Sequence, residues 1–483
     1  MTEIRSVDIS KPGFTQWLEE SALPHYFIRQ RWYADADKST LRSLKILELG
    51  LCENGLLIGL IQEQRSAESN ENSSPYLIAF IAVNNANEKD KGYISKVPSE
   101  FSSENSHFVE ASECLTGRKL IAGLFLEHLK ITWSSGTVRA RVFEQRNGRT
   151  ESSNWLNNSR SFGMEQSNTS IIYDDSVILK LFRRPGVPGE PNPDVEIPLA
   201  LSLTTELPLT PPVVGVLQSG DDQSGMVLGT LCQYLNRAET GWDMAIQAVS
   251  EALLSKDDME GDYQIQKSDE KLGTELAIRT AELHMALSRI PDNPAFMPEP
   301  VKPGDLVGLG RRLSEYASSV IQKIGKIRLD SFNEEISAGL WYLLNQETRI
   351  RNQFETLYRF KESDPLDTLF FKIRHHGDYH LGQVLYDAKL GWQVIDFEGE
   401  PNRPMHERRQ KHFALRDVAG MIRSFDYAQC VGSASFQNGS PQHKKARVWR
   451  DHLVSIYSNT YFAMVGDVEN EIFPLIPADY RLR

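Results

Sequence analysis

The stretch that decides the fold is His375-His376-Gly377-Asp378-Tyr379-His380-Leu381-Gly382-Gln383-Val384-Leu385, followed closely by Gln393-Val394-Ile395-Asp396-Phe397-Glu398-Gly399-Glu400-Pro401. It contains an acidic residue, Asp378, an amide five residues later, Gln383, and a second acidic residue, Asp396. Two short apolar runs, 383–386 and 392–395, enclose the turn 387–391. This pattern predicts a β-hairpin between the amide and the second acid.

This order of groups is typical of enzymes that transfer a phosphoryl group. The transfer needs a carboxylate that orients the acceptor hydroxyl, and oxygen ligands that hold Mg²⁺ on the nucleotide. Asp378 suits the first role, and Gln383 and Asp396 suit the second. Each residue alone has an ordinary explanation in a loop or at a strand end. The ordered set favours phosphoryl transfer.

Length and composition limit the alternatives. A chain of 483 residues is long enough for two or three domains. The net charge of −12 argues against a general nucleic-acid binder. The four cysteines have neither metal-binding nor redox spacing, the N-terminus has no apolar signal-peptide core, and the apolar run 76–83 is too short to span a bilayer. We therefore expect a cytoplasmic protein that binds neither nucleic acid nor membrane.

A second polar stretch suits the phosphates of a nucleotide. Residues 161–170 are small and polar, and lead into apolar strands at 171–173 and 177–182, joined by the turn 174–176. Backbone N–H groups and hydroxyls of such a hairpin can surround phosphates. No Walker sequence occurs in the chain. The residues expected to contact the nucleotide here are Ser167, Asn168, Thr169 and Ser170.

Lys180 interrupts the second of these apolar strands. Burying an ammonium group without a partner is costly, so we expect Lys180 to face an anion. In phosphoryl-transfer enzymes such a lysine holds phosphates and pairs with a helix glutamate, and Glu196 is the nearest candidate. A lysine that snorkels at a strand end is the alternative. The next apolar strand, 226–234, lies where backbone groups near Gln233 would contact adenine.

The rest of the chain is predicted to be mainly helical. Residues 236–365 carry apolar positions at helical spacing, for example in 271–288. A later helix, 449–462, places three aromatic side chains near one face. These could stack on a sugar ring, and core packing is the alternative. The candidate acceptor contacts are His380, Glu398, Trp449, Tyr457 and Tyr461.

The motifs resemble those of maltokinases, a family within the aminoglycoside-phosphotransferase-like kinases. The resembling segments are 30–32, 165–170, 179–184, 280–284, 376–383, 396–401 and 415–427. The resemblance implies an α+β, bilobal protein-kinase-like fold with an N-terminal mixed α/β cap subdomain. It predicts a cap at 1–90, an intermediate subdomain and nucleotide-binding lobe at 91–235, and a helical lobe with the acceptor site at 236–483.

Maltokinases use ATP and Mg²⁺ to phosphorylate the anomeric hydroxyl of maltose, and maltose 1-phosphate feeds α-glucan (glycogen) synthesis from trehalose. The resemblance implies that Asp378 is the catalytic base, that Gln383 and Asp396 hold the metal, and that Lys180 binds ATP phosphates. Gln383 stands where the wider superfamily has asparagine. Association with trehalose synthase is an implied partnership. The alternatives are a kinase for glucosamine, another sugar or an aminoglycoside and, less favoured, a nucleotide-binding pseudokinase.

Overall fold

Contacts divide the chain into two units. The first contains residues 1–255, 376–409 and 423–443, and the second contains residues 256–375, 410–422 and 444–483. The structure, a computed structural model, describes residues 3–33, 41, 43–64, 74–102, 104–143, 158–162, 168–221, 224–254, 266–328, 332, 334–356, 371–400, 403–437 and 439–466. The first unit holds both motif stretches.

A five-stranded antiparallel sheet comes first in the chain. Its order is β1 (Ser43–Leu51), β2 (Leu57–Gln64), β3 (Tyr76–Val83), β5 (Ser106–Glu110) and β4 (Tyr93–Val97). The apolar run 76–83 is β3, and every residue in it is buried. Ile78 and Phe80 pack toward α1 (Phe14–Trp17) and α2 (Leu23–Arg29), whereas Leu77 and Ile81 belong to a second core. Successive side chains of a strand point to opposite faces, so a strand buried on both faces is apolar throughout. This sheet continues to Glu110, beyond the predicted boundary at residue 90.

The second sheet has seven strands and carries the predicted nucleotide-binding residues. Its order is β6 (Lys130–Trp133), β7 (Gly136–Val142), β11 (Val213–Ser219), β12 (Met226–Gln233), β10 (Val177–Phe182), β9 (Asn168–Tyr173) and β8 (Ser159–Phe162). The turn between β9 and β10 has positive φ at Asp174 (48°) and Asp175 (47°). Two central residues with positive φ define a type I′ turn, whose twist matches that of antiparallel strands.

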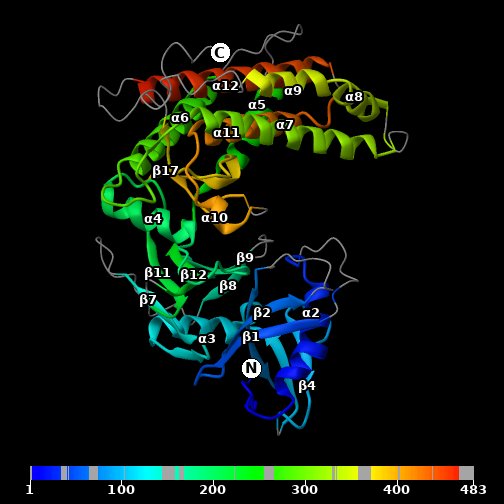
Figure 1. Cartoon of the computed structure of the whole chain (residues 1–483), viewed down its shortest axis with the longest axis vertical. Coiled ribbons are helices and arrows are strands. Elements are labelled where there is room, and N and C mark those ends of the chain that lie inside the picture. The colour runs from blue at the N-terminus through cyan, green and yellow to red at the C-terminus, as the bar shows by residue number, and fades with distance from the viewer. Residues whose placement is uncertain are drawn as a thin grey trace. The chain divides into compact units, whose positions relative to one another are not determined.

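The two sheets share one hydrophobic core. Leu77 and Ile81 of the first sheet belong to the same buried cluster as Leu179 and Leu217 of the second, together with residues of α3 (Leu115–Leu126). The backbone also connects them, because Leu77 N–H donates to the carbonyl of Arg183 at 2.8 Å. The N-terminal sheet therefore packs directly on the strands that carry the site (Figure 1).

The predicted catalytic hairpin is present. Strands β16 (Val384–Asp387) and β17 (Gly391–Val394) pair antiparallel, with Val384 opposite Val394. The short strand β13 (Glu239–Thr240) pairs with β16 and extends this sheet. The one-turn helix η8 (Leu381–Gln383) lies directly before β16 in the chain. The remaining helices of the first unit are α4 (Pro193–Thr204), α5 (Gly241–Leu254), α10 (Met405–Arg408) and the second half of α11 (Leu415–Gly432).

The second unit is mainly helical, as predicted for this part of the chain. Its helices are α6 (Lys267–Ser288), α7 (Pro303–Gly325), α8 (Glu334–Leu344), α9 (Glu347–Glu355), the first half of α11 and most of α12 (Pro441–Gly466), with a short strand pair, β14 (Glu299–Pro300) and β15 (Phe371–Lys372). Helices α6 and α12 run side by side (Figure 1). They approach closely at Gly273, where an added Cβ would lie 2.9 Å from Leu453. Within the part of the chain that the structure describes, no helix has the length and apolar character to cross a membrane.

Candidate active site

Lys180 projects from the face of the second sheet that is opposite the shared core. In β10, Leu179 and Leu181 face the shared core, so Lys180 and Phe182 point the other way. The side chain of Lys180 is 14% exposed. An ammonium group so largely buried requires anionic partners.

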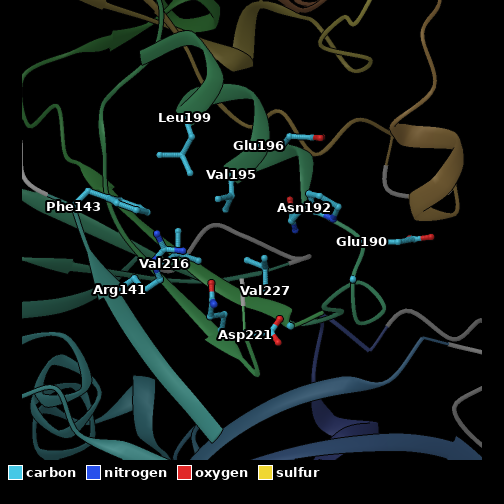
Figure 2. Close-up of a pocket in the computed structure, with 14 residues that line it drawn as sticks. Arg141, Phe143, Glu190, Asn192, Val195, Glu196, Leu199, Val216, Asp221 and Val227 are labelled. Atoms are coloured by element: carbon cyan, nitrogen blue, oxygen red, sulfur yellow. The ribbon is translucent and has the colours of Figure 1, made fainter. Parts of the chain in front are cut away.

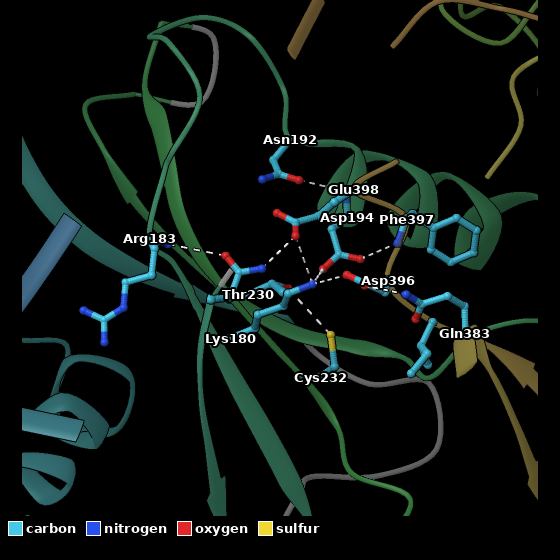
Figure 3. Close-up of polar contacts among 12 residues, drawn as sticks. Lys180, Arg183, Asn192, Asp194, Thr230, Cys232, Gln383, Asp396, Phe397 and Glu398 are labelled. Atoms are coloured by element: carbon cyan, nitrogen blue, oxygen red, sulfur yellow. Dashed lines mark hydrogen bonds and ion pairs between the residues drawn. The ribbon is translucent and has the colours of Figure 1, made fainter. Parts of the chain in front are cut away.

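Three carboxylates surround the ammonium group of Lys180 (Figure 3). Its Nζ lies 3.0 Å from Asp194 on α4 and 3.4 Å from Glu398, and it donates a short hydrogen bond to Asp396. The cluster confirms that Lys180 faces anions. The charge of Arg408 also acts on Glu398 and Asp396.

The two carboxylates that follow β17 have opposite electrostatic tendencies. Burial raises the pKa of Glu398, and the nearby Lys180 charge offsets this only partly. Burial would also raise the pKa of Asp396, but the Lys180 charge and hydrogen bonds from Lys180 and Gln383 hold that pKa below its usual value. The surroundings therefore favour the ionised form of Asp396 and disfavour that of Glu398.

The backbone at Asp396 adopts a conformation that is uncommon for a non-glycine residue. Its φ is 65°, in the left-handed region, which strains a non-glycine backbone. Residues strained in this way cluster at functional sites. Neighbouring hydrogen bonds maintain it. Phe397 N–H donates to Asp194 at 2.8 Å, and Ile395 N–H donates to the carbonyl of Gln383 at 3.0 Å. Asp194 therefore binds both Lys180 and the chain next to Asp396.

Gln383 and Asp396 are in contact, as the hairpin predicts. Gln383 Nε2 donates to Asp396 Oδ2 at 2.9 Å. Gln383 is the last residue of η8, whose N-cap is His380, and His380 Nδ1 accepts the N–H of Gly382 at 3.0 Å. Burial lowers the pKa of His380, against the opposing charges of Asp378 and Asp396. His380 therefore supports the loop, and a role in binding an acceptor stays a prediction.

His376 connects the loop of Asp378 to the segment that precedes Asp396. Its Nδ1 accepts the backbone N–H of Asp378 at 3.3 Å, and its Nε2 donates to the carbonyl of Ile395 at 2.8 Å. These two bonds assign the proton to Nε2. His376 thus positions both acidic residues, and its role as an acceptor of the Asp378 N–H was missed at the level of sequence.

The predicted nucleotide-binding stretch is only partly visible. Ser167 lies outside the described residues, and Asn168, Thr169 and Ser170 are buried in β9. Asn168 Nδ2 donates to Glu398 at 2.7 Å, so Asn168 reaches the Lys180 cluster. Phosphate binding by Asn168, Thr169 and Ser170 stays a prediction.

Gln233 ends strand β12, and the structure shows which backbone groups near it are used. The N–H of Gln233 donates to Pro212, and that of Tyr234 donates to Ser176. Within the described ranges, no acceptor is recorded for the N–H of Leu235. Adenine contact in this segment stays a prediction, with Leu235 as the better donor.

Two groups of predicted site residues are corrected. Glu196 pairs with Arg409, at 2.8 Å, and the α4 carboxylate that pairs with Lys180 is Asp194. The sequence contains a signal for this, because Asn192 at the N-cap and Pro193 in the first turn start the helix just before Asp194.

The aromatic residues of α12 are core residues. Each is at most 1% exposed, and each forms a hydrogen bond with α6. The pairs are Trp449 with Asp269, Tyr457 with Thr280, and Tyr461 with His284. The expectation that these three rings contact a sugar is therefore wrong, and the alternative of core packing is correct.

Comparison with known proteins identifies the fold. No family model matches the chain. Glucosamine kinase in complex with glucosamine, ADP and inorganic phosphate superposes with a TM-score of 0.60 at 19% identity, over 98% of this chain and 91% of that one. A second crystal form of glucosamine kinase gives a TM-score of 0.59 at 19% identity, over 98% and 91% of the two chains. The chain has a kinase-like fold.

A sequence relative agrees with this kinase-like fold. Glucosamine kinase of Streptacidiphilus jiangxiensis is 26% identical over 271 residues, which are 56% of this chain and 54% of that protein. The match thus spans about half the length of this curated relative. The predicted α+β class and kinase-like fold are confirmed, and the chain is similar to glucosamine kinases, whereas the resemblance to maltokinases stays a prediction.

Proposed function

We propose that the chain is an ATP-dependent sugar kinase. The observation that carries the proposal is the contact of Lys180 with Asp396, which in turn accepts a hydrogen bond from Gln383. A strand lysine, a metal-binding carboxylate after a hairpin, and an amide before it are the groups that phosphoryl transfer from a nucleotide requires. The similarity to glucosamine kinase supports the same class.

Asp396 and Gln383 suit Mg²⁺. Mg²⁺ in nucleotide sites takes one or two protein oxygens and completes its coordination with phosphates and water. The side chain of Asp396 is 36% exposed, whereas those of Asp194 and Glu398 are 9% and 14% exposed, so Asp396 is the accessible ligand. Gln383 would contribute its amide oxygen after rotation about its terminal bond. When bound, the metal neutralises charge on the phosphates.

The residues of the chain act by positioning and by charge. Asp378 orients the acceptor hydroxyl and takes its proton late, because the transition state of phosphoryl transfer is loose. Lys180 turns from Asp396 and Glu398 to the phosphates while it keeps its ion pair with Asp194, and it stabilises the charge that develops there. Asp194 keeps Lys180 aligned and fixes the backbone N–H of Phe397.

We propose glucosamine as the first acceptor to test, because the sequence relative is a glucosamine kinase. Maltose is the second, because the run Asp396–Pro401 resembles maltokinases. Association with trehalose synthase belongs to this second proposal.

The test is ADP release with ATP, Mg²⁺ and a panel of glucosamine, glucose, maltose and kanamycin, followed by NMR of the product. NMR shows which hydroxyl is phosphorylated. Saturable turnover with one sugar supports the proposal and selects the acceptor. Nucleotide binding without a phosphorylated product from any acceptor would support a pseudokinase instead.

A further inference from the structure

A cavity of about 200 Å³ lies between α4 and strands β7, β11 and β12 (Figure 2). Apolar side chains of α4, β11 and β12, and of Phe143 just after β7, contribute to its wall, and charged and amide side chains line it as well. The apolar lining side chains include those of Phe143, Val195, Leu199, Val216 and Val227, and Asn192 is one of the polar ones.

The cavity is on the same face of the sheet as Lys180 but is separate from the Lys180 cluster. Directly opposed residues on neighbouring strands point to the same face. The register gives one such row, from Lys180 through Thr230 and Val216 to Arg141. With neighbouring strands about 4.8 Å apart, the two ends of this row are roughly 14 Å apart. Val216 and Arg141 line the cavity, and Lys180 does not.

Helix α4 stands between the two places. Val195 and Leu199, one turn apart, face the cavity, whereas Asp194 contacts Lys180 and the N–H of Phe397. The first turn of α4 therefore contributes to both. A molecule that fills the cavity would support the helix on the side that carries Val195 and Leu199.

The packing beneath α4 is incomplete. Among the described residues, Phe182, Val195, Val213 and Val216 form the buried cluster there, and Phe143, Leu199, Val227 and Cys232 pack against it while partly exposed. The lower edge of the cavity is fixed, because Gly189 N–H donates to the carbonyl of Gly225 at 3.1 Å. The space is therefore bounded by connected strands and a helix.

Asn192 supplies an unused donor at this wall. Its Oδ1 accepts the N–H of Asp194 and caps α4, and the side chain is 2% exposed. Its Nδ2 has no acceptor among the described residues. A buried amide donor without a partner is unfavourable, and a ligand oxygen that accepts from it after a small adjustment of the wall removes that cost.

We propose that this cavity is a second ligand site, for a neutral molecule with one aromatic or branched apolar group and an oxygen acceptor. A cavity of about 150 Å³ holds benzene, so one ring with a small substituent suits this volume. The lining carries charges of both signs, Arg141 as well as Glu190 and Asp221, so it offers neither an anion nor a cation an unopposed partner. Occupancy stabilises α4 and thereby the alignment of Lys180 for nucleotide. This consequence rests on the proposed function, whereas binding itself does not.

Benzamide is a suitable probe, because it has one ring and a carbonyl oxygen. Its titration into the full chain, followed by ligand-observed NMR, should give a Kd on the order of 1 mM. Leu199→Phe and Val227→Phe should each weaken binding at least about tenfold by filling the space. Leu203→Phe is the matched control, since Leu203 is on the same helix and 76% exposed. Asn192→Ser keeps a helix cap and removes the amide, and should weaken benzamide but not toluene.

The coupling is measured with ADP. Calorimetric titration should show that saturating benzamide tightens ADP binding to the native chain about threefold to tenfold. Leu199→Phe should bind ADP tighter by the same factor without benzamide, and Leu203→Phe should have the ADP affinity of the native chain. Undiminished benzamide binding in both cavity-filling variants would overturn the site, and unchanged ADP affinity would overturn the coupling. A folded chain that binds no ADP in any variant would count against the proposed function, while the benzamide titrations would still decide the cavity.

Discussion

Asp194 and Lys180 form an ion pair of 3.0 Å between helix α4 and strand β10, and the other oxygen of Asp194 accepts the backbone N–H of Phe397. One carboxylate thus fixes the lysine and the residue after Asp396. Both side chains of the pair are largely buried, at 9% and 14% exposed, so removal of either charge is costly.

Asp194→Asn should raise the KM for ATP about tenfold, because Lys180 loses its α4 partner and turns further toward Asp396 and Glu398. The amide oxygen can still accept from Phe397, which keeps the fold. Glu196→Gln, two residues along the same helix, is the matched control and should change this KM less than about threefold. Steady-state kinetics at varied ATP decide, and equal effects of the two changes would refute the role of Asp194.

Asp378→Asn should lower kcat by about 10²–10⁴-fold while the KM for ATP stays nearly unchanged, because an amide cannot take the proton of the acceptor. Asp451→Asn, at a side chain that is 69% exposed, is the control for the same chemical change. Near-normal turnover in purified, folded Asp378→Asn would remove the catalytic base from the proposal.

Glu398→Gln should increase the free energy of unfolding relative to that of the native chain, and the increase should grow as pH rises. Burial raises the pKa of Glu398 in the folded chain, so the fold favours the protonated acid. The associated stability is present below the ordinary pKa of 4.5 and is lost as pH rises through the folded value. A neutral amide removes that loss. Urea unfolding at several pH values gives the free energy of unfolding of the variant and of the native chain. A difference between these two free energies that does not grow from about pH 4 to about pH 8 would contradict the prediction.

His375→Phe should reduce acid sensitivity. Burial, opposed by the charge of Asp417, lowers the pKa of His375 to about 3 from 6.5. The unfolded chain therefore binds a proton below about pH 6.5 that the folded chain does not, and stability is lost as pH falls. Neither ring nitrogen has a partner among the described residues, so phenylalanine suits the site.

Between about pH 7.5 and about pH 4.5, the free energy of unfolding of His375→Phe should fall by up to about 2–3 kcal/mol less than that of the native chain, as measured by urea unfolding. His25→Phe, at an exposed position, is the control. Parallel losses of stability on acidification in native chain and His375→Phe would disprove this role for His375.

Trp449→Phe should lower stability and leave sugar binding intact. The change removes the hydrogen bond to Asp269 and part of a buried ring, at a cost of about 1–3 kcal/mol. Thermal unfolding gives the stability, and the KM for the sugar should stay within about twofold. A large rise in that KM at unchanged stability would restore the sugar-contact interpretation.

The catalytic hairpin and the strand of Lys180 could be predicted because their signals are local. Alternating apolar residues, a turn sequence and fixed spacing place Asp378, Gln383 and Asp396 before any tertiary contact is known. Likewise, the apolar run 76–83, too short to span a bilayer, predicts a buried strand, and every residue of β3 is buried.

The partner of Lys180 was harder to predict, because it depends on where α4 begins. A start at Pro193 selects Asp194, whereas a later start would have favoured Glu196. The aromatic residues of α12 show a second limit. Helical spacing predicts that Trp449, Tyr457 and Tyr461 share a face, but the direction of that face depends on the partners that α6 offers.

The single core beneath the two sheets has a practical consequence for the evolution and handling of this chain. Loss of the residues before β6 would remove the first sheet and α3, and would leave Leu179 and Leu217 facing water on a broad apolar surface. Such surfaces promote aggregation. A shortened version that starts near β6 should therefore be recovered as insoluble protein, even though every residue around Lys180 is still encoded. The N-terminal sheet could be lost only together with substitutions that make this face polar.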